Sequence, residues 1–456
     1  MARSLAAEAD AKFHFHPYTQ PRDLEKNGAL VVVGGRGVHV TDEHGKEYIE
    51  GMAGLWCAAL GFSEQRLVDA AHRQMQKLPY YHTFSGKVSG PVTELVEVMM
   101  RWSPVPMARI LFANSGSESN DTAVKLVRYY HNAIGQPQKK KIIARVKGYH
   151  GVTLAAASLS GIPTMHKHFD LPMPETIRVS CPHPYQFAKS GETPDAFAER
   201  LATELEDTIL REGPETVGAF IAEPVQGAGG VIIPPPRYFD LIQPILKKYN
   251  ILLIADEVVS GFGRLGKAFG SEVYGLQPDF ITVAKMLTSA YVPMSALYVS
   301  DRVYQAVADA SAEVGVFGHG YTYGGHPVAC AVALEALKIY EEQDVIGHVN
   351  RVSPRLHEGL KKFSSHPYVG DVRGMGLIAA VELAADPASR TPFAAEKGVG
   401  AYLVRRAQEH GLILRAMAGD IVAFSPPLII SDAEIDELLV RFERALDDTT
   451  AWINGR

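Results

Sequence analysis

The feature that most constrains the fold of this chain is the alternation of short apolar runs with amphipathic stretches between residues 92 and 299. The apolar runs occupy residues 110–113, 142–146, 217–222, 251–255, 280–284 and 296–299. Helical patterns lie between most of them, for example at residues 238–249. Strands that are apolar on both faces and separated by helices are typical of a parallel sheet covered by helices. The sequence therefore predicts an α/β protein with a mostly parallel central sheet.

The two ends of the chain predict a smaller α+β unit. Period-two patterns predict a small antiparallel sheet, with strands at residues 29–33, 38–40 and 48–49 and turns at 34–35 and 43–46. Ser63 is the expected cap of a helix that runs to about Lys77. After Pro327 a long helix leads to strand patterns at residues 377–383, 412–414 and 421–424.

We expect the C-terminal strands to pack against residues 29–50. We therefore predict two domains: a small one built from both ends of the chain and a large one built from its middle. The small domain combines an N-terminal segment, residues 1–60, with residues 327–456. The large domain contains residues 61–326.

Charge and cysteine usage exclude several classes of protein. The 45 Lys and Arg and the 51 Asp and Glu residues give a formal net charge of -6, without the basic stripe that a nucleic-acid surface needs. The apolar run at residues 52–62 is too short to span a bilayer. Cys57, Cys181 and Cys330 are odd in number and far apart, so neither a disulfide framework nor a zinc site is expected. We therefore expect a cytoplasmic protein with no membrane, nucleic-acid or metal partner.

A turn of small residues follows the first apolar run of the large domain. The sequence Asn114-Ser-Gly-Ser-Glu-Ser119 opens a predicted helix directly after residues 110–113. Small side chains let the backbone approach a ligand, and the free N–H groups at a helix N-terminus favour an anion such as phosphate. The helix dipole contributes only about 0.3–2 kcal/mol, so other groups must share in the binding. Taken alone, the pattern is equally compatible with a simple helix cap.

Two charged residues follow neighbouring apolar runs. Asp256 comes after residues 251–255, and Lys285 comes after residues 280–284. Because ligands bind beyond the carboxyl ends of parallel strands, both side chains are expected beside the turn at 114–119. A lysine in a partly apolar pocket can lose its proton and form a Schiff base with a carbonyl, while an aspartate can keep a heteroaromatic nitrogen protonated. Either charge alone could be a solvated strand end, but the combination indicates a pyridoxal phosphate site.

The sequence resembles the class III (ω-) aminotransferases of the fold type I pyridoxal phosphate family. The motifs that carry the resemblance extend over nearly the whole chain. They are Gly51-Met-Ala-Gly-Leu-Trp56, Asn114-Ser-Gly-Ser-Glu-Ser119, Gly148-Tyr-His-Gly151, Ala222-Glu-Pro-Val-Gln-Gly-Ala-Gly-Gly230, Ala255-Asp-Glu-Val258, Ala284-Lys285 and Thr322-Tyr-Gly-Gly-His-Pro327. The resemblance implies a fold type I architecture, pyridoxal 5′-phosphate as the cofactor and a homodimer with shared active sites, with a tetramer as an alternative.

The resemblance also implies a role for each residue around the cofactor. Lys285 is expected to form the Schiff base and to shuttle a proton, and Asp256 to bind the pyridine nitrogen. Further cofactor contacts are expected from ring-facing, phosphate-binding and neighbouring residues: Tyr149 and Val258 on the two ring faces, Ser115, Gly116 and Ser117 at the phosphate, Thr322 from the neighbouring subunit, and His150 and Glu223 nearby. A role for His150 as a supporting or core histidine is at least as acceptable as a catalytic one, and Glu223 is expected to make structural hydrogen bonds near the cofactor.

The substrate pocket is expected to be aromatic, with one cation. Tyr18, Trp56, Phe84 and Tyr149 match aromatic positions that line the pocket in amine:pyruvate relatives, and Ala228 is expected as a small wall contributed across the dimer. Arg415 matches an arginine that pairs with the substrate carboxylate. A guanidinium can bind a carboxylate through two charge-assisted hydrogen bonds.

Departures from other branches of the family bear on the amino acceptor. Ala423, before Phe424-Ser-Pro-Pro-Leu428, stands where ornithine- and 4-aminobutyrate-type relatives carry an arginine. Those relatives also tend to have an acidic residue in place of Ala228 and a glutamine in place of Val259. These differences favour pyruvate over 2-oxoglutarate. Met286 replaces a glycine common in relatives, a difference that the sequence does not explain.

The expected function is a ping-pong transfer of an amino group from a primary amine or ω-amino acid to pyruvate, which gives alanine. A 2,1-aminomutase of the glutamate-semialdehyde type and a 2-oxoglutarate-using class III aminotransferase remain alternatives, as do a decarboxylating transaminase and a protein that only binds. The natural amine stays open among β-alanine, taurine, diamines and aryl amines.

Overall fold

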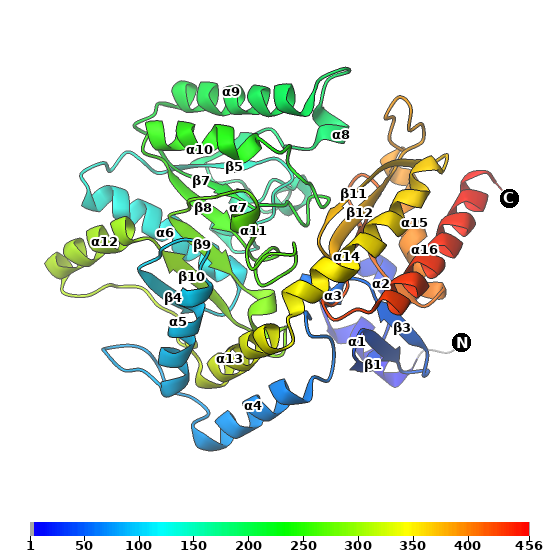
Figure 1. Ribbon diagram of the computed structural model, residues 1–456, viewed down its shortest axis with the longest axis horizontal. Helices are drawn as coiled ribbons and strands as arrows, with labels where there is room; N and C mark the ends of the chain where they lie inside the picture. The colour runs from blue at the N-terminus through cyan, green and yellow to red at the C-terminus, as the bar shows by residue number, and fades with distance from the viewer. Residues whose placement is uncertain (1–3, 456) are drawn as a thin grey trace.

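A seven-stranded sheet forms the centre of the protein in the computed structural model, which describes residues 4–455 (Figure 1). Its order is β4-β10-β9-β8-β7-β5-β6. The strands are β4 (Arg109–Ala113), β5 (Lys141–Arg145), β6 (Thr176–Val179), β7 (Val217–Ala222), β8 (Leu252–Asp256), β9 (Phe280–Val283) and β10 (Ser295–Val299). The pairs β5–β6, β5–β7, β7–β8 and β8–β9 are parallel, whereas β10 is antiparallel to both β9 and β4. The predicted mostly parallel sheet is therefore confirmed.

Helices cover both faces of this sheet because its central strands are apolar on both sides. On one face, α9 (Pro194–Glu212) and α10 (Tyr238–Lys248) pack against Phe220 of β7 and its neighbours. On the other face, α6 (Gly116–Ala133) and α12 (Asp301–Val314) pack against Ile221 and its neighbours. Adjacent residues of one strand thus serve two separate cores. The shorter helices of this part are α7 (Leu154–Leu159), α8 (Pro184–Phe187) and α11 (Gly270–Val273), with 3-10 turns η1 (Pro163–Met165) and η2 (Lys285–Thr288).

Two four-stranded sheets lie beside the large one. The first has the order β1-β2-β3-β13 and the second β11-β12-β15-β14. Their strands are β1 (Val32–Arg36), β2 (His39–Asp42), β3 (Glu47–Glu50), β11 (Val369–Met375), β12 (Ile378–Leu383), β13 (Leu412–Ile413), β14 (Arg415–Met417) and β15 (Ile421–Phe424). Because β13 pairs in parallel with β3, the C-terminal part packs against the N-terminal strands, as expected. The division into domains at residues 60 and 326 stays a prediction.

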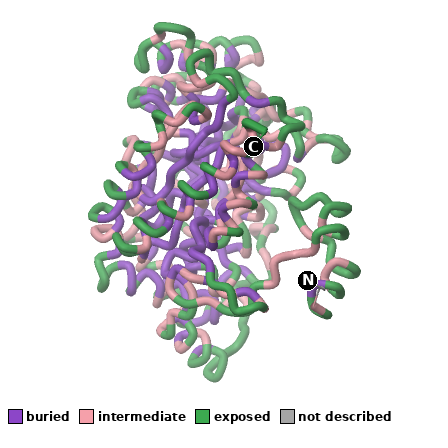
Figure 2. The backbone as a smooth tube through the Cα atoms, turned by 90° about the vertical axis from the view of Figure 1, so that its right-hand side faces the viewer, coloured by how far each residue is buried: buried purple, intermediate pink, exposed green. Residues whose placement is uncertain are grey.

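The remaining helices join these sheets into one structure. They are α1 (Leu5–Phe13), α2 (Pro21–Asn27), α3 (Ala53–Trp56), α4 (Gln65–Lys77), α5 (Gly90–Trp102), α13 (Pro327–Glu342), α14 (Val345–Lys361), α15 (Val399–Glu409) and α16 (Asp432–Ile453), with 3-10 turns η3 (Lys362–Ser365) and η4 (Ala395–Lys397). A single hydrophobic core runs from α5 and α13 to α14, α15 and α16. Figure 2 shows the buried interior against the largely exposed N-terminal arm. Among the described residues, no helix is both long enough and apolar enough to cross a membrane.

Two local predictions at the N-terminal strands are wrong. Gly34 and Gly35 lie inside β1, and the chain turns instead at Gly37, whose φ of 59° suits a glycine. A Cβ on Gly35 would lie 3.0 Å from the Phe62 side chain, so the strand needs a glycine here for close packing. Ser63 does not cap α4. Its hydroxyl donates to the Gly35 carbonyl, and the carboxylate of Glu64 accepts the Arg66 N–H instead.

Candidate active site

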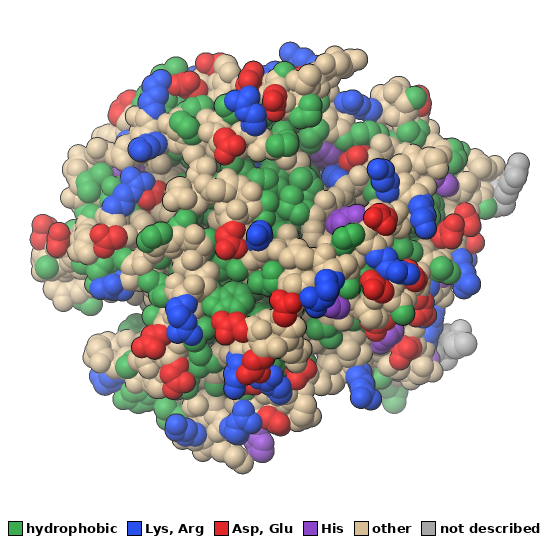
Figure 3. Space-filling view, viewed as in Figure 1, with side chains coloured by type: hydrophobic (Ala, Val, Ile, Leu, Met, Phe, Trp, Pro, Cys, Tyr) green, Lys and Arg blue, Asp and Glu red, His purple; other side chains and the backbone are tan. Residues whose placement is uncertain are grey.

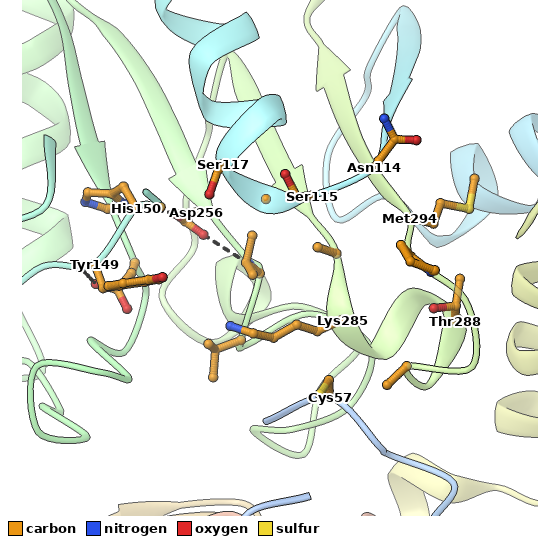
Figure 4. Close-up of a pocket in the computed structure, with 18 of the residues that line it drawn as sticks. Cys57, Asn114, Ser115, Ser117, Tyr149, His150, Asp256, Lys285, Thr288 and Met294 are labelled. Carbon is orange, nitrogen blue, oxygen red and sulfur yellow. Dashed lines mark hydrogen bonds and ion pairs between the residues drawn. The ribbon is translucent and has the colours of Figure 1, made fainter. Parts of the chain in front are cut away.

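The candidate site lies at the carboxyl ends of β4, β8 and β9, where the sequence predicts it. Asp256 ends β8, Lys285 begins the turn after β9, and Ser115 caps the helix that follows β4. Figure 4 shows Lys285 extending toward the side of Tyr149, with Asp256 above it and Ser115 and Ser117 higher still, at the start of α6. These side chains surround an inner cavity of about 340 Å³.

The first residues of α6 lie very close to neighbouring segments of the chain. Ser115 caps the helix by accepting the Glu118 N–H at 3.2 Å. A Cβ on Gly116 would lie 3.0 Å from the Val258 side chain. Gly151 has a φ of 131°, and a Cβ there would lie 2.5 Å from the hydroxyl of Ser117. Glycine at both positions lets three chain segments meet around the helix N-terminus, where free N–H groups favour an anion.

Asp256 is held in one position by a buried network. Only 3% of the residue is exposed. Its Oδ2 lies 2.8 Å from His150 Nδ1 and accepts a 2.9 Å hydrogen bond from the Asn120 amide, and its Oδ1 accepts the Val258 N–H. Burial opposes ionisation, but the hydrogen bonds from His150 and Asn120 outweigh it and lower the pKa of Asp256. The carboxylate therefore stays ionised at neutral pH.

Glu223 fixes the backbone around Tyr149. One carboxylate oxygen accepts the Tyr149 N–H at 3.0 Å, and the other accepts the Gly227 N–H at 2.9 Å. Burial raises the pKa of Glu223. Burial, together with a hydrogen bond to Tyr18, raises the pKa of the Tyr149 hydroxyl, so this hydroxyl remains protonated. Glu223 thus has a clear structural role next to the cavity.

Lys285 has an unusual backbone conformation, and the pKa of its amine is lowered. Its φ of 48° lies in the left-handed region, where strained residues of functional sites are often found. Burial lowers the pKa of its amine, and Arg415 contributes in the same direction. The amine lies 5.7 Å from the centroid of the Trp56 ring. A lysine with a lowered pKa has more of the neutral amine that can act as a nucleophile or base.

Met286 now has a structural explanation. Its sulfur accepts a 3.7 Å hydrogen bond from the buried guanidinium of Arg264, and its carbonyl accepts the Tyr340 hydroxyl at 2.6 Å. Arg264 also donates to the carbonyls of Leu377 and Pro426. The residue after Lys285 therefore joins the turn to α13 and to the C-terminal strands.

An outer cavity of about 360 Å³ adjoins the inner one. Tyr149, Glu223, Val259 and Lys285 line both. The predicted substrate residues Tyr18, Trp56, Ala228 and Arg415 line the outer cavity. The Arg415 guanidinium lies 5.2 Å from the Trp56 ring centroid and 6.0 Å from that of Tyr18. The amine of Lys285 and the guanidinium of Arg415 therefore both lie close to the same Trp56 ring, at 5.7 Å and 5.2 Å from its centroid.

Most predicted site residues lie at these two cavities. The inner one is lined by Ser115, Gly116, Ser117, Tyr149, His150, Glu223, Asp256, Val258 and Lys285. Phe84 and Thr322 line neither cavity in this chain. Both are exposed, Phe84 to 45%. The expectation that Ala228 crosses from a partner is wrong, because Ala228 lines the same cavity as Lys285 of its own chain.

Some residues at the site were not predicted. Asn120, which binds Asp256, lies one helical turn after Gly116, so helical spacing alone could have indicated it. Cys57 lines the inner cavity directly after the Gly51–Trp56 motif. Leu55, which lies inside the Gly51–Trp56 motif, lines the outer cavity together with Lys147 and the segment 161–164, which belong to no motif.

The fold and site are those of a fold type I pyridoxal phosphate enzyme, and comparisons with known proteins agree. A family model described as Aminotransferase class-III matches residues 22–446. Gamma aminobutyrate transaminase 1, mitochondrial, from Solanum lycopersicum is 51% identical over 434 residues, which are 95% of this chain and 84% of that protein. The omega transaminase from Pseudomonas jessenii in complex with PMP has a TM-score of 0.97 and 52% identity, covering 99% of each chain. A structure described as "Transaminase with L-ala" has a TM-score of 0.91 and 49% identity, covering 93% of this chain and 100% of that one.

The chain belongs to the class III aminotransferases, whose cofactor is pyridoxal phosphate. The residues of the inner cavity fit this group. A buried carboxylate with a lowered pKa faces a lysine with a lowered pKa, and the glycine-containing start of a long helix lies beside them. The cavity volume lies in the range usual for small-molecule sites, which is about 300–1,000 Å³.

Proposed function

We propose that this protein is an ω-aminotransferase that moves an amino group from a primary amine or ω-amino acid to pyruvate and so forms alanine. The observation that carries the proposal is that Arg415 lies beside the same Trp56 ring as Lys285, in the outer cavity that both residues line. Within residues 4–455 no carboxylate forms an ion pair with Arg415, so its guanidinium is available to a substrate carboxylate. The relative crystallised with L-alanine gives independent support for this acceptor.

The inner-cavity residues would hold the cofactor by groups of matching chemistry. Ser115, Gly116 and Ser117 would bind its phosphate at the helix N-terminus. Tyr149 and Val258 would contact the two ring faces. Asp256 would keep a proton on the ring nitrogen, and His150 with Asn120 would hold Asp256 in place.

When bound, the cofactor supplies an aldehyde for amino-group transfer and a ring that accepts electron density. Lys285 would hold the cofactor covalently through this aldehyde. Its amine, whose pKa is lowered, would serve as the base that takes the proton from the substrate carbon and delivers it to the carbon on the other side of the transferred nitrogen. Arg415 orients the keto acid in the second half of the cycle, and Trp56 and Tyr149 exclude water.

Small side chains around Arg415 favour pyruvate over a longer dicarboxylate. Ala423 of β15 lies directly opposite Arg415 of β14 in the strand register. Relatives that carry an arginine at this position have a second guanidinium beside the first. Ala423, which carries no charge, instead leaves Arg415 without a second guanidinium opposite it.

An acceptor and donor panel tests the proposed function. The purified protein, loaded with pyridoxal phosphate, is given β-alanine, 4-aminobutyrate, taurine, a diamine or an aryl amine with either pyruvate or 2-oxoglutarate. We expect alanine from pyruvate and much less glutamate from 2-oxoglutarate. Absence of alanine with every donor would refute the proposal, and turnover without any acceptor would instead indicate an aminomutase.

Replacing Arg415 by Leu is expected to weaken pyruvate binding selectively. Hydrogen bonds to charged groups contribute about 1.5–3 kcal/mol, so the KM for pyruvate should rise by about 10- to 150-fold. The single-turnover reaction with an aryl amine that lacks a carboxylate should change by less than about threefold. Arg415→Lys, which keeps the charge but not the two-pronged geometry, should lie in between. An unchanged KM for pyruvate in Arg415→Leu would rule out this role.

We also propose that a second copy of the chain completes the site. Phe84 and Thr322, which do not reach the cavities of their own chain, lie on one shared surface. The Tyr80 hydroxyl donates to the Thr322 carbonyl at 2.8 Å, and a Cβ on Gly320 would lie 3.1 Å from the Phe84 ring. Exposed Tyr80, Tyr81 and Tyr323 surround them, as is typical of an interface.

A hybrid experiment tests this shared site. Lys285→Ala and Phe84→Asp/Thr322→Asp chains, each inactive alone, are mixed under conditions that exchange subunits. If each site combines residues of two copies, hybrids should recover up to about one quarter of the wild-type activity by random pairing. A monomer in light scattering, or no recovery of activity after proven subunit exchange, would contradict the proposal.

We propose that the protein is located in the cytoplasm. Its three free cysteines support this location, whereas the Solanum relative is described as mitochondrial.

A further inference from the structure

Glu50 is a buried carboxylate that no ion pair neutralises within residues 4–455. It is the last residue of β3, and only 4% of it is exposed. One carboxylate oxygen accepts the Met52 N–H at 3.1 Å, and the other accepts the Gly54 N–H. Both oxygens are therefore occupied by the backbone of the segment that immediately follows.

This segment has an uncommon backbone conformation. Ala53, Gly54 and Trp56 have φ values of 46°, 67° and 60°, all in the left-handed region. The Met52 carbonyl in turn accepts the Trp56 N–H at 2.9 Å. A non-glycine residue keeps such a conformation only where surrounding contacts impose it. The two hydrogen bonds that the Glu50 carboxylate accepts are contacts of this kind.

The same segment forms one wall of both cavities. Leu55 and Trp56 line the outer cavity, and Cys57 lines the inner one. The Trp56 ring lies 5.7 Å from the amine of Lys285 and 5.2 Å from the guanidinium of Arg415. A shift of this ring would change the space between the amino-transfer position and the proposed carboxylate-binding position.

We propose that Glu50 is a positioning residue for substrate selection: its carboxylate holds the backbone of residues 52–54 so that the Trp56 ring keeps its place beside Lys285 and Arg415 in the outer cavity. The consequence is strongest for bulky aryl amines, which must pack against the indole. This inference rests on the proposed function, because it assumes that amine donors enter the outer cavity.

The hydrogen bonds by which Glu50 positions the segment before Trp56 depend on pH. Burial raises the pKa of Glu50 to about 7, although the Met52 N–H opposes the shift. The ionised carboxylate offers two strong acceptors, whereas the protonated acid carries an O–H that faces two N–H donors. The charged groups on neighbouring elements, Lys285 after β9 and Arg415 on β14, contact Trp56 and not Glu50. The donor KM of the wild type should thus rise as the pH falls from 8 to 6.

Glu50→Gln in the cofactor-loaded enzyme tests the inference. An amide can accept only one of the two N–H bonds, and it does not titrate. We expect the KM for 1-phenylethylamine to rise about five- to tenfold at pH 8, with a smaller change in kcat and in the KM for β-alanine. With KM expressed as the concentration of unprotonated amine, which removes the titration of the donor itself, the wild-type change between pH 8 and pH 6 should disappear in the variant. Glu50→Asp, which keeps the charge, should retain that pH dependence.

Asp42→Asn is the matched control. Asp42 is also a buried carboxylate of the first small sheet and accepts the His44 and Lys46 N–H groups, but its turn does not reach the cavities. This variant should lose stability and keep the wild-type KM values and pH profile. If Glu50→Gln behaves like wild type, or if Asp42→Asn shows the same KM change, the inference is wrong.

A measurement without turnover separates this inference from the proposed function. The emission difference between wild type and Trp56→Phe isolates the signal of Trp56. Acrylamide quenching of that signal should increase as the pH falls through about 7 and should be independent of pH in Glu50→Gln. If the wild type forms no alanine, the proposed function fails, and a missing quenching transition in an active wild type overturns the inference alone.

Discussion

Lys285→Ala is expected to abolish amino-group transfer and the yellow colour of the cofactor-loaded protein. The variant removes both the amine that attaches to the cofactor and the base that moves the proton. Loss of positioned proton transfer alone costs a factor of about 10²–10⁴, and loss of the covalent attachment adds to it. Stopped-flow measurement of alanine formation reports the loss of amino-group transfer. Visible absorbance, and borohydride reduction followed by peptide mapping, report the loss of the covalent link.

Two further variants show whether the effect belongs to the amine of Lys285. Lys285→Arg keeps a positive charge but cannot form the covalent link, so it should be as inactive as the alanine variant. Lys139 is also buried and donates to three backbone carbonyls at the opposite end of the sheet. Lys139→Ala should therefore lower stability while keeping the yellow colour. Retention of the borohydride-reducible link in Lys285→Ala would refute the assigned role.

Asp256→Asn is expected to lower kcat by about 10²–10³, by analogy with the loss of one preorganised electrostatic group. Asn has nearly the shape of Asp but no charge, so it cannot keep the ring nitrogen protonated. Its amide would also place N–H donors opposite His150 and Asn120, where the carboxylate accepts. Lys285 and the residues proposed to bind the phosphate are intact in this variant. Cofactor binding should therefore persist, and the loss should appear in single-turnover rates with saturating amine.

The pKa of Asp256 predicts the pH range over which this group acts. Because the folded-state pKa is lower than normal, the stabilising contribution of the carboxylate is present above its unfolded pKa and disappears only as the pH falls through the folded value. Activity loss between pH 8 and 6 should thus not arise from Asp256. Asp279→Asn, which breaks the ion pair of the buried Asp279 carboxylate with exposed Arg302 at the amino end of β9, is the control for general destabilisation. An Asp256→Asn enzyme with wild-type kcat would contradict the assignment.

The large sheet could be predicted because its strands are apolar on both faces, as in residues 217–222. The short edge strand β6 was missed, since Thr176, Ile177 and Arg178 are only half-buried and lack a strong pattern. β14 was missed for a similar reason, because Arg415, Ala416 and Met417 are partly exposed and β14 contains only three residues. Apolar burial, which is the basis of sequence patterns, is weak at sheet edges.

The site was predictable where one residue type does one chemical task. Lys285 and Asp256 follow buried strands, so topology alone places them at one edge. Tertiary packing decides whether a loop lines the cavity of its own chain or that of another copy, and motif spacing does not encode this packing. For this reason the prediction for Ala228 was wrong. Positioning groups such as Glu50 act through backbone N–H groups and leave no motif that distinguishes them from an ordinary buried acid.

The parallel pairing of β3 with β13 also orders events during synthesis of the protein. The strands that carry Asp256 and Lys285 lie within the first two thirds of the chain, whereas Arg415 leaves the ribosome near the end. The strand ends around the inner cavity can therefore become structured on a nascent chain while the outer cavity still lacks Arg415. Closing contacts between such distant segments is slow. A newly made molecule should thus bind its cofactor before it is able to select a substrate.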